Sequence, residues 1–393
     1  MKNVILHYSW LLVCSILMAM TMSSCESTST ETQNPSAYIT DSEKLAMLHS
    51  MKDLDGTGRL YEINYTADYM LDKVLAAGIT KSNDLFNYVA YLLFDNKPNE
   101  SANVSYGAGC SAFAVPDPKS KDFLMGRNYD YRHSNNTGYV ATSAILVHTA
   151  PEGGKKSISM VDGLNLIYYG QGFYTDGNTD LSLLMGLPYA ALDGINEDGF
   201  AIGILALKEK QTEQLSDKPK ISPTVAIRLL LDRASTVEEA VAMLDNYAMD
   251  MRGNGRSNYH YFMADATGDY AIVEYTIPDG DSIPRFMEVL KGNDTLRCVT
   301  NFYVSPTMAG TTDGWGSSHG LDRYDTLRNN LLINNYMLSE DAAMGLLEKV
   351  AQAPTEELTS QTQWSALYNL TDKTVRLTIL REYAKEYKFK VGK

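Results

Sequence analysis

From Cys110 onward the chain alternates short apolar, β-prone runs with turn residues, while its helical patterns are gathered in separate blocks. The clearest example is segment 259–274, where two β-prone runs flank a turn at 265–269 and predict a hairpin. Strands that follow one another through hairpins, with helices kept apart from them, are typical of α+β folds built on antiparallel sheets. We therefore expect such a fold and not a strand–helix–strand nucleotide-binding fold.

The residues before Cys110 show a different pattern. Leu45, Leu48 and Met51 recur at helical spacing, and further apolar stretches continue this pattern up to residue 98. We expect residues 40–109 to form a helical segment that precedes a domain spanning residues 110–393.

The composition excludes two classes of partner. The chain has 393 residues, of which 44% are apolar, and its formal net charge is -14. A large core is therefore expected. Nucleic-acid binding and charge-driven docking on anionic membranes both need a basic surface, so we expect neither. The composition carries no signal for an oligomeric state.

The N-terminus resembles a secretory signal. A short basic start precedes an apolar run from Trp10 to Met22 that is too short to cross a bilayer comfortably. Small residues and then Cys25 follow it. This order resembles a bacterial lipoprotein signal, in which the cysteine is lipidated and becomes the first residue; the alternative is an ordinary signal peptide cut nearby.

The lipoprotein interpretation divides the N-terminal part of the chain. Residues 1–24 would be the signal peptide and residues 25–39, which are polar, a flexible tether. We expect an exported protein held by a lipid anchor at the periplasmic face or the cell surface.

Several short motifs lack part of the pattern that the corresponding binding or catalytic sites require. The pair Gly107 and Gly109 lacks the rest of a dinucleotide fingerprint, and acidic turns after Asp53 and Asp176 lack the later ligands of a calcium loop. Ser318 lies in a G-x-S-x-G match, but a loop rather than a buried strand precedes it. The six histidines are scattered. We therefore expect no metal and no organic cofactor.

Cysteine usage leaves two thiols to explain. Cys14 would leave with the signal peptide and Cys25 would be lipidated, so Cys110 and Cys298 remain, either as one pair or as two free thiols. A free cysteine is more often a small buried hydrophobe than a nucleophile. The surroundings of Cys110 make it the exception.

Cys110 follows Gly109 and is the first of a series of polar residues that recur along the chain. The others are Arg127, Asp130, Asn196, Asn301 and Arg323. In this order and spacing the set resembles the choloylglycine hydrolase family of linear amide C–N hydrolases. That family includes bile salt hydrolases, penicillin V acylase, acid ceramidase and N-acylethanolamine amidase. The resemblance covers roughly residues 110–390, and segment 40–109 resembles the N-terminal portion of the ceramidase-like branch.

The resemblance implies an N-terminal-nucleophile fold, a four-layer αββα sandwich of two antiparallel sheets. It also implies that cleavage before Cys110 gives this residue a free α-amine, which serves as the base for its own thiol. Gly109 eases the strained turn that self-cleavage needs.

The family's roles carry over to the matching positions. Arg127 would lie near the sulfur and lower the pKa of the thiol, and Asp130 would orient the α-amine. Asn196 would help to form the oxyanion hole. Asn301 and Arg323 would secure the amine and the site.

One departure shapes the functional hypothesis. In this chain 109 residues precede the cysteine, so the α-amine exists only if the chain is cut between Gly109 and Cys110. We expect autoproteolysis into two associated chains and hydrolysis of a small-molecule acyl amide, with loops 132–139, 170–182 and 306–320 beside the pocket. The alternatives are an acyltransferase that uses the same site and a lipid-anchored binding protein with an inactive site.

Overall fold

The computed structural model describes residues 41–93, 108–131, 133–135, 138–164, 181–207, 213–252, 258–276, 286–309, 320–353 and 361–393. The chain divides into a body, Asn34–Lys393, and a separate N-terminal unit, Met1–Gln33. The predicted signal peptide, tether and lipidation site at Cys25 lie outside the described residues. So do Ser318 and most residues of the loops expected at 170–182 and 306–320. Most of segment 132–139, which was expected to be a loop, is described and forms the short strands β5 His133–Asn135 and β6 Gly138–Val140.

The larger of the two main sheets has nine strands in the order β1-β2-β7-β8-β9-β10-β13-β14-β15. Their bounds are β1 Lys52–Asp53, β2 Leu60–Tyr65, β7 Ala144–Thr149, β8 Ser157–Asp162, β9 Ala191–Asn196, β10 Ala201–Leu207, β13 Asn258–Ala264, β14 Tyr270–Thr276 and β15 Phe286–Lys291. Every neighbouring pair is antiparallel except β2 and β7. The hairpin predicted over 259–274 is confirmed as β13 and β14.

The smaller main sheet has six antiparallel strands in the order β16-β3-β4-β17-β18-β19. Their bounds are β16 Cys298–Val299, β3 Ala108–Pro116, β4 Phe123–Tyr131, β17 Gln361–Asn369, β18 Thr374–Ile379 and β19 Tyr387–Lys390. Every residue of β17 is buried, and so is all of β4 after its first residue. A strand buried on both faces must lie in the middle of layered structure.

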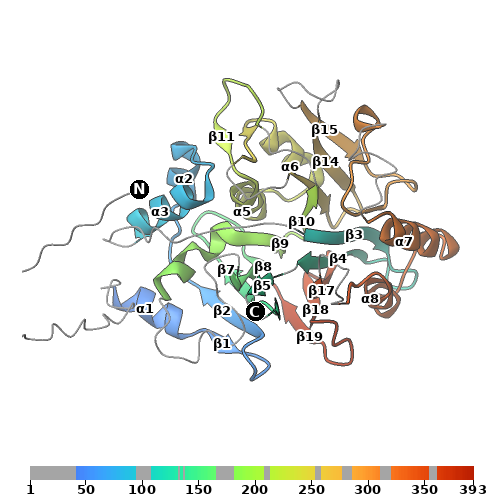
Figure 1. Cartoon of the computed structure of the whole chain (residues 1–393), viewed down its shortest axis with the longest axis horizontal. Coiled ribbons are helices and arrows are strands. Elements are labelled where there is room, and N and C mark those ends of the chain that lie inside the picture. The colour runs from blue at the N-terminus through green and yellow to red at the C-terminus, as the bar shows by residue number, and fades with distance from the viewer. Residues whose placement is uncertain are drawn as a thin grey trace, which may run out of the picture. The chain divides into compact units, whose positions relative to one another are not determined.

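Helices cover the outer faces of both sheets (Figure 1). Helix α5 packs on β9 and β10 of the larger sheet, whereas α7 packs on β3 and β16 and α8 packs on β4 and β17 of the smaller one. The helical elements are α1 Ser42–His49, α2 Leu71–Ala77, α3 Ser82–Leu93, η3 Leu181–Ala190, α5 Pro223–Arg233, α6 Val237–Leu244, η4 Pro306–Met308, α7 Leu321–Ile333 and α8 Glu340–Lys349. Two short strand pairs, β5 His133–Asn135 with β6 Gly138–Val140 and β11 Lys220–Ile221 with β12 Ala248–Met249, complete the described elements.

The two sheets face each other in the middle of the body. Arg127 on β4 forms an ion pair with Asp193 on β9, and Gly203 on β10 lies against the same arginine side chain. With helices outside each sheet, the architecture is the four-layer αββα sandwich that the sequence predicts. One hydrophobic core joins buried residues of both sheets and of the N-terminal segment.

The expectation of a purely helical segment before Cys110 is wrong in one respect. Helices α1, α2 and α3 lie there, but so do strands β1 and β2. Strand β2 reads Leu-Tyr-Glu-Ile-Asn-Tyr, and its tyrosines and isoleucine are residue types that favour strands. Its parallel pairing with β7 makes it part of the larger sheet rather than an appendage.

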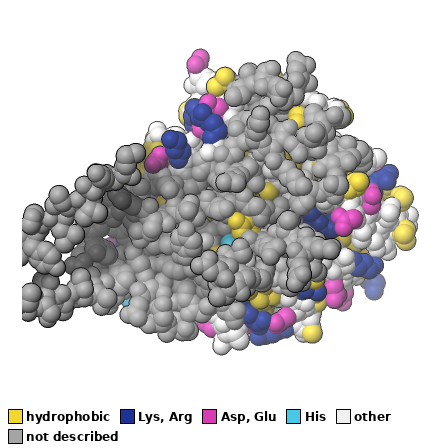
Figure 2. Space-filling model, viewed as in Figure 1, with side chains coloured by type: hydrophobic (Ala, Val, Ile, Leu, Met, Phe, Trp, Pro, Cys, Tyr) yellow, Lys and Arg dark blue, Asp and Glu magenta, His cyan; other side chains and the backbone are white. Residues whose placement is uncertain are grey.

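The described surface carries both signs of charge. Figure 2 shows acidic and basic side chains interspersed over the described part of one face. None of the helices within the described residues combines the length and the apolar character that a membrane span requires.

Candidate active site

Cys110 lies inside strand β3, between β16 and β4. Its register partner on β4 is Tyr129, and Gly109 pairs with Asp130. The predicted cleavage point between Gly109 and Cys110 therefore falls within a paired strand. The cysteine is 1% exposed, and Cys110 and Cys298 are both free thiols in the described part of the chain.

Four of the other five predicted catalytic residues lie around Cys110. The backbone N–H of Cys110 donates to Asn301 Oδ1 at 2.6 Å, and Arg127 Nη2 lies 3.9 Å from the Cys110 sulfur. Arg323 donates through Nη1 to the carbonyl oxygen of Cys110 at 2.6 Å and lies 3.5 Å from an Asp130 carboxylate oxygen.

Burial has the largest effect on the pKa of the Cys110 thiol. It raises the pKa of the Cys110 thiol above its ordinary value, and the nearby Arg127 guanidinium opposes that rise. The effect of Arg127 thus has the predicted sign, but the effect of burial is larger, and the pKa of the thiol stays above its ordinary value. Burial therefore disfavours the thiolate, and a base beside the sulfur would be needed to form it.

Asp130 is enclosed by donors that the sequence did not reveal. It accepts hydrogen bonds from Thr362 Oγ1 at 2.5 Å and from Gln352 Nε2 at 2.8 Å. Burial raises the pKa of the Asp130 carboxyl above its ordinary value, and Arg323 opposes this. Because Thr362 lies far from Asp130 in the sequence, only the pairing of β17 with β4 brings the two together.

Asn196 is the predicted site residue that the structure places elsewhere. Its Nδ2 group donates to the carbonyl oxygens of Leu231 and Ala234 at 3.1 and 2.7 Å. Its Oδ1 accepts from the backbone N–H groups of Asp198 and Phe200, each at 3.1 Å. Both amide hydrogens are committed to the end of α5, so the predicted oxyanion role is contradicted, and Asn196 instead secures the β9–β10 turn.

A second buried acid lies close to the site. Asp162 accepts from Tyr129 Oη at 2.9 Å and contacts His133 Nε2 at 2.8 Å, and it also accepts from Thr142 Oγ1. The ring of Tyr129 stacks on Trp364 with centroids 4.1 Å apart. Burial raises the pKa of Asp162, but His133 and the other donors outweigh this and hold it below its ordinary value.

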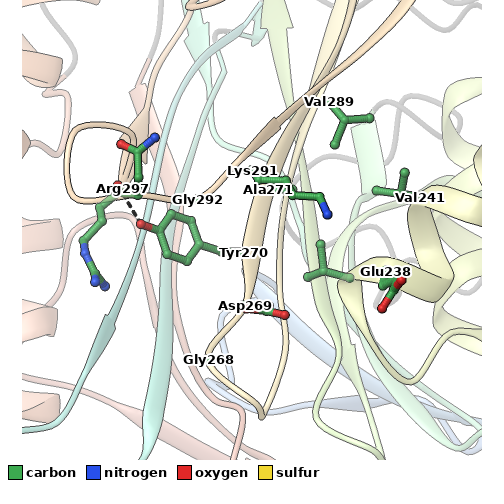
Figure 3. Close-up of a pocket in the computed structure, with 12 residues that line it drawn as sticks. Glu238, Val241, Gly268, Asp269, Tyr270, Ala271, Val289, Lys291, Gly292 and Arg297 are labelled. Atoms are coloured by element: carbon green, nitrogen blue, oxygen red, sulfur yellow. Dashed lines mark hydrogen bonds between the residues drawn. The ribbon is translucent and has the colours of Figure 1, made fainter.

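A surface cleft of about 450 Å³ lies between α6 and the β14–β15 hairpin (Figure 3). Its lining mixes apolar side chains such as Val241 and Val289 with the charged Glu238 and Lys291. None of the predicted site residues lines it. The cleft is therefore separate from the residues around Cys110.

Comparison with known proteins places the sequence of this chain in a family. Residues 117–382 match the family described as acyl-coenzyme A:6-aminopenicillanic acid acyl-transferase. The match begins after Cys110 and includes Arg127, Asp130, Asn301 and Arg323. A search of curated proteins finds no match.

Two solved structures show a distant likeness. A mutant of conjugated bile acid hydrolase from Clostridium perfringens is 16% identical, with a TM-score of 0.49, over 72% of this chain and 92% of that one. Penicillin V acylase from Agrobacterium tumefaciens is 18% identical, with a TM-score of 0.47, over 69% of this chain and 83% of that one.

The family match spans about two thirds of the chain and agrees with the resemblance to N-terminal-nucleophile enzymes that the sequence motifs indicate. The chain belongs to the acyl-coenzyme A:6-aminopenicillanic acid acyl-transferase family.

Proposed function

We propose that this protein hydrolyses a non-peptide linear amide through a thioester on Cys110, after autoproteolysis between Gly109 and Cys110. The observation that carries the proposal is the placement of one nitrogen. The backbone nitrogen of Cys110, which cleavage would turn into an α-amine, already lies 2.6 Å from Asn301 Oδ1. The amine would therefore be held in place beside its own thiol.

The proposed reaction begins with proton transfer from the thiol to the α-amine. The sulfur attacks the carbonyl carbon of the substrate amide, and the ammonium then gives its proton to the leaving nitrogen as the C–N bond breaks. Water attacks the thioester with the amine as base, which releases a carboxylic acid and restores the thiol. The substrate class is a fatty, bile-acid-like or arylacetyl group on a small amine or amino acid.

The surrounding residues support these steps. Arg127 lies close enough to the sulfur to stabilise its thiolate. Asp130 and Arg323 form a buried ion pair 3.5 Å apart, and Arg323 also donates to the Cys110 carbonyl oxygen, so the pair would orient the residue that carries the amine. Asn301 is fixed by Arg323 Nη2, which donates to its Oδ1 at 2.8 Å.

The test uses the full chain expressed in a bacterial host. Intact-mass measurement is expected to find two chains that part at Gly109–Cys110, and Cys110→Ala is expected to give one chain without turnover. Cys298→Ala, the other buried thiol, is the matched control and should keep both properties. A fully active wild-type protein in one piece would contradict the proposal. Candidate substrates are glycine- and taurine-conjugated bile acids, N-acylethanolamines, ceramides and penicillin V.

Acyl transfer is the second candidate, because the matching family is described as an acyl-transferase. In that reaction an amine replaces water in the attack on the thioester. Turnover of an active substrate with added 6-aminopenicillanic acid or another amine, followed by mass spectrometry of the products, distinguishes the two. A new amide that grows with amine concentration indicates transfer, and free acid alone indicates hydrolysis.

We also propose export and lipid anchoring at Cys25. The apolar run that ends at this cysteine supports both. Cells labelled with a palmitate analogue are expected to label the wild-type protein and not Cys25→Ala. Equal label on both proteins would contradict the proposed anchor.

A further inference from the structure

Arg127 reaches across the gap between the two sheets. It belongs to β4 of the six-stranded sheet, and its fully buried guanidinium pairs through Nη1 with Asp193 on β9 of the nine-stranded sheet. Its Nη2 donates to the carbonyl oxygen of Ile204 on β10 at 2.5 Å and lies 3.9 Å from the Cys110 sulfur. The position of this side chain is therefore set by the opposite sheet.

Hydrogen bonds also fix the position of Asp193, the partner of Arg127. Trp364 Nε1 donates to Asp193 Oδ2 at 3.1 Å, and Tyr368 Oη donates to its Oδ1. The guanidinium and the indole N–H both donate to Oδ2 and favour the carboxylate form, whereas burial raises the pKa of this carboxyl. Because Trp364 and Tyr368 both come from β17, the carboxylate is fixed between the sheets and in turn fixes Arg127.

Gly203 provides the space for Arg127. It is the register partner of Asp193 across β9 and β10. A Cβ atom at this position would lie 2.7 Å from Arg127 Cδ and 2.8 Å from its Nε, both closer than real contacts allow. Glycine is therefore required for the guanidinium to lie where it does.

We propose that Asp193 and Gly203 are positioning residues, which together form a slot that fixes the Arg127 guanidinium at its distance from the Cys110 sulfur. This inference rests on the proposed role of Cys110 as nucleophile. Asp193 and Gly203 shift the thiol–thiolate equilibrium of Cys110 in opposite directions. Gly203 lets the cation come close, which favours the thiolate, whereas the carboxylate of Asp193 offsets part of that cation's charge, which disfavours it.

The experiment follows the alkylation of Cys110 by iodoacetamide as a function of pH in the full chain. Mass spectrometry of the peptides separates Cys110 from Cys298. Gly203→Ala should displace the guanidinium and raise the midpoint of the profile by about one pH unit, because the thiolate loses its nearest cation. Asp193→Asn keeps an amide oxygen that can accept from the guanidinium, and the Ile204 carbonyl oxygen still accepts from Arg127 Nη2, so the cation stays in place. The variant should therefore lower the midpoint by a similar amount, because the cation then acts without its counter-ion.

Two controls match these changes. Gly345→Ala adds a methyl group on α8, where a Cβ meets nothing within 4 Å, and Asp341→Asn removes a carboxylate that is 90% exposed. Both should leave the midpoint unchanged. Circular dichroism and the thermal midpoint establish that each variant is folded.

A double variant keeps the proposal testable if Asp193→Asn alone does not fold. Arg127→Gln with Asp193→Asn removes both charges, which avoids leaving one buried ion unpaired. In that background the midpoint should lie above that of the wild type, and adding Gly203→Ala should shift it no further. An equal shift from Gly203→Ala with and without Arg127 would overturn the proposal, as would shifts of the same sign from both single variants.

This readout is separate from the proposed function. Alkylation reports the thiol whether or not an amide is cleaved, so a protein without hydrolase activity would still show the opposite shifts. Unchanged midpoints in an active enzyme would reject the slot and leave the proposed hydrolysis standing.

Discussion

Arg323 donates to the carbonyl oxygen of Cys110 at 2.6 Å and, through its other terminal nitrogen, to Asn301 Oδ1 at 2.8 Å. The same Asn301 oxygen accepts the backbone N–H of Cys110. One arginine thus fixes both the residue that would be the nucleophile and the residue that would hold its α-amine. The planar, forked guanidinium is suited to such a paired contact, which a lysine could not reproduce.

The first prediction concerns the acceptor of the future amine. Asn301→Ala removes the oxygen that lies 2.6 Å from the Cys110 nitrogen, so the amine would lose its fixed position beside the thiol. Misplacement of a reacting group costs about a hundredfold in rate, and we expect turnover to fall by that order. Steady-state kinetics on the cleaved enzyme measure it.

A matched control for this change is Asn334→Ala on the exposed end of α7, which should keep wild-type turnover. Since we expect Asn301→Ala to slow cleavage of the chain as well, intact mass is measured in parallel and rates are referred to the cleaved fraction. A cleaved Asn301→Ala enzyme with wild-type turnover would exclude this role.

Most of the site could be predicted from the sequence, because the order and spacing of its polar residues resemble those of a known family. Cys110, Arg127, Asp130, Asn301 and Arg323 were all expected there, and the structure brings them together. The partners Thr362, Gln352 and Asp193 were not expected, because strand pairing and not sequence spacing brings them near. For Asp193 a signal existed, since it is a carboxylate among the apolar residues Ala191, Leu192 and Ile195 of its strand.

The fold class was likewise predicted from the segregation of strands and helices, but the role of the N-terminal segment was not. Strand β2 is short, and helical patterns surround it. Such a segment joins a sheet only where a neighbouring strand has an unpaired edge, and here that strand is β7. The local sequence pattern does not reveal such an edge. The helical patterns on both sides of β2 therefore led to the wrong assignment of this strand as helix.

The second prediction separates Asn196 from catalysis. The residue makes four hydrogen bonds within the β9–β10 turn and to the end of α5. Asn196→Ala leaves these buried groups without a partner, so we expect a loss of about 2–3 kcal/mol in the free energy of unfolding, measured with urea. The kcat of the folded enzyme should change less than threefold, roughly the scatter of structural substitutions. A hundredfold fall in kcat with unchanged stability would restore the oxyanion role.

The third prediction concerns the buried Asp162. Its pKa is held below its ordinary value because His133 and hydroxyl donors favour the charged form over the cost of burial. A depressed carboxyl pKa stabilises the folded state above the unfolded value of about 4, and this stabilisation is lost as the pH falls through the folded value. Asp162→Asn should therefore lower the free energy of unfolding by about 3 kcal/mol at pH 7, and by less below pH 4.

Urea unfolding at several pH values measures this difference. Asp72→Asn, a carboxylate that is 84% exposed, is the control and should cost little at any pH. A difference for Asp162→Asn that stays constant from pH 7 to pH 3 would contradict an ionised Asp162.

The fourth prediction concerns the small chain that cleavage at Gly109 would release. Strand β2 lies inside the nine-stranded sheet next to β7, and Tyr69 Oη donates to Asp232 on α5 at 2.7 Å. Departure of the small chain would uncover the edge of β7 and the buried residues that pack on it, which is unfavourable. The two chains should therefore remain together through gel filtration at neutral pH and separate only when the whole body unfolds in urea.

Tyr69→Phe should lower the urea midpoint, because it leaves the buried Asp232 short of a donor at a cost of about 1–3 kcal/mol. Release of the small chain in urea well below the unfolding of the large one would show that β2 is dispensable for the fold.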